Sequence, residues 1–140
     1  MIIVDSSVWF DLFNTDKYRR NLAKKLFELI ESKDIPILEP RVFEIEFIAL
    51  LSRKYIKEEV INIFNTVKDK IVVLPNPDDL AFNIALNTGC RAIDSYFIAL
   101  TKLTDSLLVS NDKTQISNAR KFKVKSYYLI EEFDKFKEEL

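Results

Sequence analysis

The chain has 140 residues, of which 48% are apolar and 31% are charged, and its formal net charge is −1. This composition predicts a globular protein with a real core, and it excludes a strongly basic protein that binds nucleic acid through bulk charge. Histidine is absent and Gly89 is the only glycine, which excludes imidazole catalysis, histidine metal sites, P-loops and glycine-rich dinucleotide motifs.

Short apolar runs alternate with amphipathic segments along the chain. In chain order the pattern predicts strand Ile2–Val4, helices Ser6–Phe13 and Asp16–Lys33, strand Ile35–Leu38, helices Arg41–Tyr55 and Lys57–Lys68, strand Ile71–Leu74, a helix from Asp78 or Asp79 to Thr88, helix Asp94–Leu103, strand Leu107–Val109, helix Asp112–Lys121, strand Val124–Tyr128 and helix Glu131–Leu140. This alternation predicts an α/β fold with a mostly parallel sheet. Ligands bind such sheets outside the carboxyl ends of the strands.

Other features concern organisation and location. The composition shows no linker or repeat, so we predict a single domain over residues 1–140. No apolar run approaches the ~18 residues of a membrane span, and the apolar start breaks at Asp5 without a basic flank. The lone cysteine, Cys90, suits a reducing compartment. We therefore expect a cytoplasmic protein without a membrane partner.

Two acidic residues follow predicted strands. Asp5 comes directly after Ile2–Val4, and Asp112 follows Leu107–Val109 after two intervening residues. If these strands are parallel, both carboxylates lie at the same edge of the sheet. Asp5, Asp94 and Asp112 also each stand at a predicted helix start, where aspartate is a favoured N-cap worth about 1 kcal/mol. Helix capping therefore stays open as an alternative for all three.

A fourth acid lies inside a helix. Glu46 has Val42 and Leu50 on its helical face, and a carboxylate in apolar surroundings is costly unless it is paired or bound to a cation. A pair with Arg53, two turns on, is the simple alternative. Glu44 is a competitor on nearly the opposite side of the helix, and periodicity does not decide between the two glutamates.

Carboxylates gathered at one site repel one another, so some are protonated or a divalent cation lies among them. Without histidine or a cysteine cluster the ligands are oxygen only, which favours Mg²⁺ or Mn²⁺. A carboxylate-held Mg²⁺ with open water positions is suited to phosphoryl chemistry.

Four segments carry a family resemblance over most of the chain. They are IIVDSS (Ile2–Ser7), PRVFEIEFIALLSR (Pro40–Arg53), GCRAIDSYFIAL (Gly89–Leu100) and LLVSND (Leu107–Asp112). In this order and spacing they resemble the PIN domain, and most of all the VapC-type toxins of type II (VapBC) toxin–antitoxin modules. The resemblance implies a three-layer α/β/α sandwich and a Mg²⁺- or Mn²⁺-dependent endoribonuclease. It also implies a homodimer that is inhibited by a cognate VapB-type antitoxin.

The resemblance also implies site residues. The family's metal-binding and catalytic acids fall on Asp5, Glu46, Asp94 and Asp112. Glu46 is favoured over Glu44 because apolar residues and then a basic residue follow it, as the family's helix has them. Glu46 is the candidate water-orienting base, since its apolar setting should raise its pKa. Lys113 stands where some relatives carry a further acid, so the number of metal ions, one or two, stays open.

The candidates for contact with the RNA substrate are Ser6, Ser110, Asn111 and Lys113. For both serines, fixing the acids or capping a helix is an alternative role. A housekeeping PIN nuclease and a non-catalytic RNA-binding or scaffold PIN domain are the alternative functions. A receiver-type phospho-acceptor domain is disfavoured, because neither Ile35–Leu38 nor Ile71–Leu74 ends in aspartate.

Overall fold

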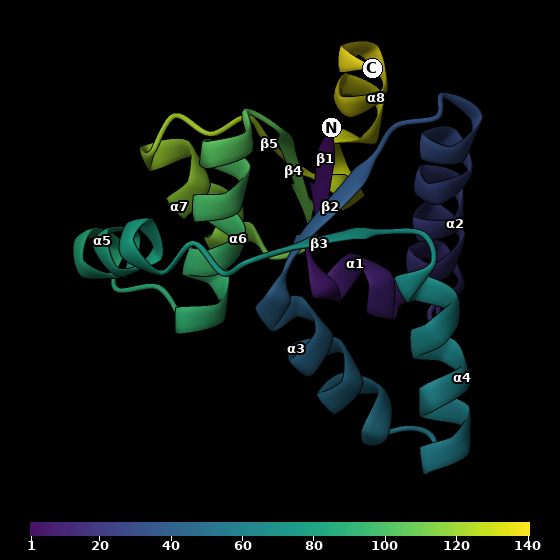
Figure 1. Cartoon of the computed structure of the whole chain (residues 1–140). Coiled ribbons are helices and arrows are strands. Elements are labelled where there is room, and N and C mark those ends of the chain that lie inside the picture. Colours follow the sequence, from purple (N-terminus) through teal and green to yellow (C-terminus); the bar gives the residue numbers. More distant parts are fainter.

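A five-stranded sheet forms the centre of the protein, with the strand order β3-β2-β1-β4-β5 (Figure 1). The computed structural model describes all residues, 1–140. The strands are β1 (Ile2–Val4), β2 (Ile37–Pro40), β3 (Val72–Leu74), β4 (Leu107–Ser110) and β5 (Ser126–Tyr128). Every neighbouring pair is parallel, so the predicted α/β fold with a parallel sheet is confirmed.

Eight helices flank this sheet and make it the middle of three layers. They are α1 (Ser6–Asp11), α2 (Lys17–Ser32), α3 (Arg41–Ser52), α4 (Lys57–Lys68), α5 (Asp78–Thr88), α6 (Ala92–Thr104), α7 (Lys113–Lys121) and α8 (Leu129–Glu139). Figure 1 shows α6 and α7 on one face and α2 on the other. No helix is long and apolar enough to cross a membrane.

The core lies on both faces of β1. Ile2, Ile3 and Val4 are fully buried, because β1 is the central strand and helices cover both of its sides. On one side Trp9 of α1 packs against an aromatic cluster that includes Phe43 of α3. The buried β1 thereby holds the residue that follows it, Asp5, in a fixed place at the sheet edge.

Two element boundaries differ from the prediction in ways that matter for the site. Strand β2 runs on to Pro40 instead of ending at Leu38, so Glu39 is a strand residue and fully buried. Helix α6 begins at Ala92, after Arg91 in extended conformation, so Asp94 lies within the first turn and not at the N-cap. The predicted helix stop at Gly89 is confirmed, with the left-handed conformation that glycine adopts without strain.

Candidate functional site

The carboxyl ends of β1 and β4 bring two predicted acids to one edge of the sheet. Val4 pairs with Val109, and the backbone N–H of Asp5 donates to the Val109 carbonyl at 2.9 Å. A pocket of about 260 Å³ opens at this edge, and its lining includes Asp5, Glu46 and Asp112. Residues that follow β1 and β4 therefore meet a residue of α3 at the place where α/β sheets bind ligands.

Asp5 is buried at the pocket, with only 5% of its surface exposed. Its Oδ2 accepts hydrogen bonds from Ser7 Oγ and Ser110 Oγ, both at 2.8 Å, and its Oδ1 makes none. Burial raises the pKa of this carboxyl to about 7; the two serines lower it, and Glu46 and Asp94 raise it further. The Asp5 side chain caps no helix, although the residue occupies the N-cap position of α1. The capping alternative is therefore wrong for Asp5.

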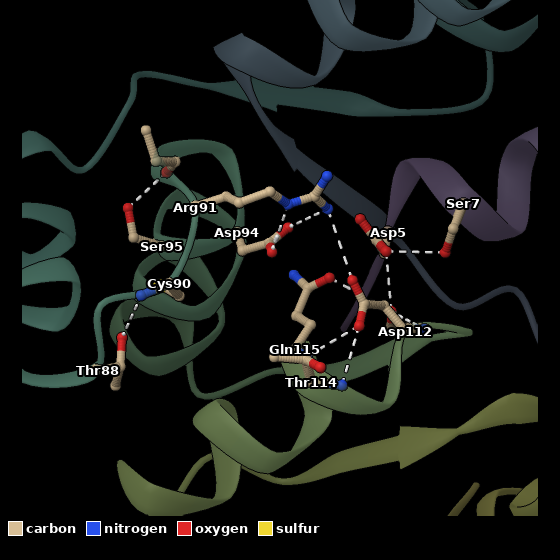
Figure 2. Close-up of polar contacts among 12 residues, drawn as sticks. Asp5, Ser7, Thr88, Cys90, Arg91, Asp94, Ser95, Asp112, Thr114 and Gln115 are labelled. Carbon is tan, nitrogen blue, oxygen red and sulfur yellow. Dashed lines mark hydrogen bonds and ion pairs between the residues drawn. The ribbon is translucent and has the colours of Figure 1, made fainter.

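Arg91 joins the other two aspartates. Figure 2 shows its guanidinium between Asp94 and Asp112, with Asp5 nearby. Arg91 Nε and Nη2 donate to the two oxygens of Asp94 at 3.2 and 3.3 Å, and Nη2 lies 3.6 Å from Asp112 Oδ2. Burial is the main cause that raises the pKa of Asp94, and Arg91 opposes it. One cation thus joins Asp112, which lines the pocket, to Asp94, which does not.

Asp94 and Asp112 differ in whether their side chains cap a helix. Asp112 Oδ1 accepts from the backbone N–H groups of Thr114 and Gln115, at 2.9 and 3.3 Å, so Asp112 caps α7 as predicted. This bond uses Oδ1 and leaves Oδ2 facing Arg91. Asp94 caps nothing, because Arg91 stands at the N-cap of α6.

The two glutamates of α3 point in different directions. Glu46 lines the pocket, is half-buried and forms no ion pair, so the alternative pair with Arg53 does not form. Burial is the main cause that raises the pKa of Glu46, while the nearby Ser6 hydroxyl lowers it. Glu44 instead pairs with Arg41 at 3.4 Å and with Lys68 at 3.9 Å. The structure therefore puts Glu46, and not Glu44, in the acid pocket.

The four candidates for substrate contact have different surroundings. Ser110 is buried; its Oγ donates to Asp5 and accepts the Asp112 backbone N–H at 3.0 Å, so it holds two acids in place. Ser6 lines the pocket, and its buried hydroxyl lies near Glu46 but makes no hydrogen bond of good geometry. Of these two serines, Ser6 has the hydroxyl without a hydrogen-bond partner, but that oxygen is buried.

Asn111 and Lys113 are engaged with the protein itself. Asn111 Nδ2 donates to Asp11 Oδ2 at 2.6 Å, and its Oδ1 accepts the Ile130 backbone N–H at 3.2 Å. Lys113 pairs with Glu131 at 3.4 Å and lies over the Tyr128 ring, outside the lining of the acid pocket. Neither side chain points a free donor into the pocket in this conformation.

Sequence reasoning missed three residues of this region. Arg91 precedes Asp94 by three positions, a spacing at which side chains meet on a helix, and this signal was available. Asp11 lines the pocket and is buried, with an ion pair to Arg19 at 3.6 Å. Glu39 is fully buried beneath the site, and the Trp9 indole N–H donates to its Oε2 at 2.8 Å. No pattern in the sequence marks these last two acids as buried.

The donor set is suited to a hard divalent cation. All four predicted acids offer carboxylate oxygens, and Asp5 Oδ1 and the Glu46 carboxylate make no hydrogen bond of good geometry with the protein. No group of three or more acidic side chains is, however, arranged closely enough to hold a metal ion as the structure stands. The ligand chemistry fits Mg²⁺ or Mn²⁺, since one or two carboxylates together with bound waters hold such an ion.

Solved structures with the same architecture include a toxin. VapC20 from Mycobacterium tuberculosis, a Sarcin-Ricin loop cleaving toxin, is 18% identical, with 84% of this chain and 94% of that chain covered at a TM-score of 0.68. FitAcB from Neisseria gonorrhoeae is 13% identical, with 92% and 98% covered at a TM-score of 0.65. PAE2754 from Pyrobaculum aerophilum is 14% identical, with 84% and 83% covered at a TM-score of 0.64. At these identities the likeness shows a shared fold.

Sequence comparison decides the family. No curated protein matches the chain significantly. The PIN domain family matches residues 2–121, which include all four predicted acids. This chain belongs to the PIN domain family.

Proposed function

We propose that the protein is a metal-dependent endoribonuclease, and that it is the toxin of a VapBC-type toxin–antitoxin module. Membership of the PIN domain family supports a nuclease, and the likeness to VapC20 supports a toxin. The observation that carries the proposal is the pocket at the carboxyl edge of the sheet, where the buried Asp5 lies beside Glu46 and Asp112.

Each acid has a proposed task. Asp5, Asp94 and Asp112 would hold Mg²⁺ or Mn²⁺, with Glu46 completing the set. When bound, the metal supplies an activated water and offsets charge on the phosphoryl oxygens. Ser7 and Ser110 orient Asp5 through their hydrogen bonds to its Oδ2.

Glu46 is the proposed general base. It is half-buried, its pKa is raised chiefly by burial, and no cation pairs with it. A carboxylate with a raised pKa accepts a proton from water more readily near neutral pH. Ser6, whose buried hydroxyl lies beside Glu46 and lowers its pKa, is proposed to position Glu46.

Two exposed apolar surfaces support the proposed protein partners. Between α3 and α4 a hollow of about 370 Å³ is lined by five apolar side chains, among them Ile48, Ile61 and Phe64. On α5, Phe82 and Leu86 are each 73% exposed, and exposed apolar surfaces of this kind are where the proposed antitoxin and second copy of the chain would bind. The single-domain organisation and the cytoplasmic location stay predictions of the sequence.

The proposal is tested by incubating labelled RNA with the protein in Mg²⁺, in Mn²⁺ and in chelator. Cleavage is expected only with metal. Asp5→Asn and Glu46→Gln are expected to lower the rate by at least about 100-fold, the usual contribution of a positioned acid–base group. Glu44→Gln is the matched control, since Glu44 lies on the same helix but pairs outside the pocket, and it is expected to cleave like the wild type.

Two results would contradict the proposal. Cleavage that persists in chelator would exclude metal dependence. Cleavage that persists in Asp5→Asn would show that the acid pocket is not the active site. RNA binding without cleavage under any metal condition would favour the non-catalytic alternative.

A further inference from the structure

Arg91 lies at the mouth of the acid pocket, at the N-cap of α6. Its guanidinium binds both oxygens of Asp94 through Nε and Nη2, and Nη2 also faces Asp112 at 3.6 Å. The side chain is 74% exposed. Because so little of it is packed against the protein, the ion pairs with the two aspartates set its position.

Arg91 is the one cation in the structure that forms an ion pair with any of the four predicted acids. Asp5 and Glu46 have no such partner, and Asp94 and Asp112 have only Arg91. Its charge also acts on Glu46, whose pKa it lowers. One guanidinium thus offsets part of the repulsion among the acids. No three of the acids lie close enough together to form a metal-binding group.

A guanidinium and a divalent cation compete for these oxygens. Arg91 uses both oxygens of Asp94, and it faces the one Asp112 oxygen that the α7 cap leaves free. A metal ion bound to the same oxygens would meet a positive charge within a few ångströms, which is unfavourable at a partly buried site. The two cations therefore cannot occupy the site together in this arrangement.

We propose that Arg91 is a tethered counter-cation that holds Asp94 and Asp112 in the metal-free protein and that a divalent metal ion must displace. The inference rests on the proposed function, since it takes these acids as metal ligands. Arg91 is then a positioning residue that sets the affinity for metal. Its release is feasible because the guanidinium itself is exposed and can move into solvent, although its main partner, Asp94, is buried.

The test measures Mn²⁺ binding to metal-free protein by isothermal titration calorimetry, with no RNA present. Arg91→Gln is expected to bind Mn²⁺ about twofold to thirtyfold more tightly than the wild type, the range for losing two ion pairs whose cation is exposed. Arg91→Lys, which keeps the charge, is expected to stay nearer the wild-type affinity. Arg41→Gln is the matched control, because Arg41 forms the same i,i+3 pair with Glu44 at the start of α3, and its affinity is expected to be unchanged.

The outcomes separate this inference from the function on which it rests. If the wild type binds Mn²⁺ and Arg91→Gln binds it no more tightly, the inference is overturned and the metal site stands. If the wild type does not bind Mn²⁺ at all, the proposed function fails and the inference fails with it. Circular dichroism of Arg91→Gln, whose side chain is exposed, verifies that a changed affinity does not come from misfolding.

Discussion

Asp5 should destabilise the metal-free protein at neutral and alkaline pH, and Asp5→Asn should remove that cost. The carboxyl is buried, and no cation forms an ion pair with it. Asparagine has nearly the same shape, and its Oδ1 can accept the hydrogen bonds that Ser7 and Ser110 now donate. The substitution therefore removes the charge while it keeps the local packing.

The expected magnitude follows from the pKa. The Asp5 pKa rises from its usual 3.8 to about 7 in the folded protein, which corresponds to about 4 kcal/mol. Below pH 3.8 the carboxyl is protonated in both states and costs nothing. Between these two pKa values the unfolded chain loses the proton and the folded protein keeps it, so the free energy of unfolding falls by about 1.4 kcal/mol per pH unit. Above pH 7 the full cost is present and the curve is flat.

Urea denaturation in chelator at pH 5, 6, 7 and 8 measures this effect. Relative to the wild type, Asp5→Asn should gain about 3 kcal/mol in free energy of unfolding between pH 5 and pH 7. Asp134→Asn, at an exposed position on α8, is the control and should show no such pH-dependent difference. A difference between Asp5→Asn and the wild type that does not change with pH would refute the reasoning.

Two further predictions concern hydrogen bonds around the site. Trp9→Phe removes the indole N–H that donates to the fully buried Glu39, whose pKa burial raises well above its ordinary value. In urea denaturation this substitution should lower the free energy of unfolding by roughly 1–3 kcal/mol, whereas Glu39→Gln should not lower it. Ser110→Ala removes the hydroxyl that bonds both Asp5 and the Asp112 backbone, and should weaken Mn²⁺ binding about 10- to 100-fold by calorimetry. Ser110→Thr keeps the hydroxyl and should bind like the wild type; equal loss in both variants would contradict the role given to the hydroxyl.

The sheet was predictable because its strands are continuous apolar runs. A run such as Ile2–Val4 reads as a strand buried on both faces, and the alternation with helices implies parallel pairing. The prediction failed where a polar residue is buried. Glu39 is an acidic residue, and in a sequence an acidic residue normally marks the end of a buried strand. In the structure the indole N–H of Trp9, on α1, donates a hydrogen bond to Glu39. That contact depends on the tertiary fold.

The candidate site was predictable in part for the same reason. A residue directly after a buried strand has its position set by the sheet, so Asp5 and Asp112 were expected at one edge and lie there. For Glu46 and Glu44 the residues alone left the choice open, and only the packing of α3 separates a pocket-facing side chain from one paired with Arg41. Arg91 was not predicted as a site residue, because its role depends on two acids that lie 18 positions apart in the chain.

An aspartate that follows a strand can be a helix cap, a site residue or both, and Asp5 and Asp112 differ in this respect. Asp112 is both, because one oxygen caps α7 while the other faces Arg91. Asp5 caps nothing, and its burial opposes stability by an amount that no protein cation offsets. A neutral side chain in place of this carboxyl would make the folded protein more stable. The presence of the carboxyl therefore has to be explained by something other than stability. Binding a cation at 1,000 times its dissociation constant returns about 4.1 kcal/mol, which matches the cost of ionising Asp5. The proposed metal site therefore accounts for Asp5 where capping does not.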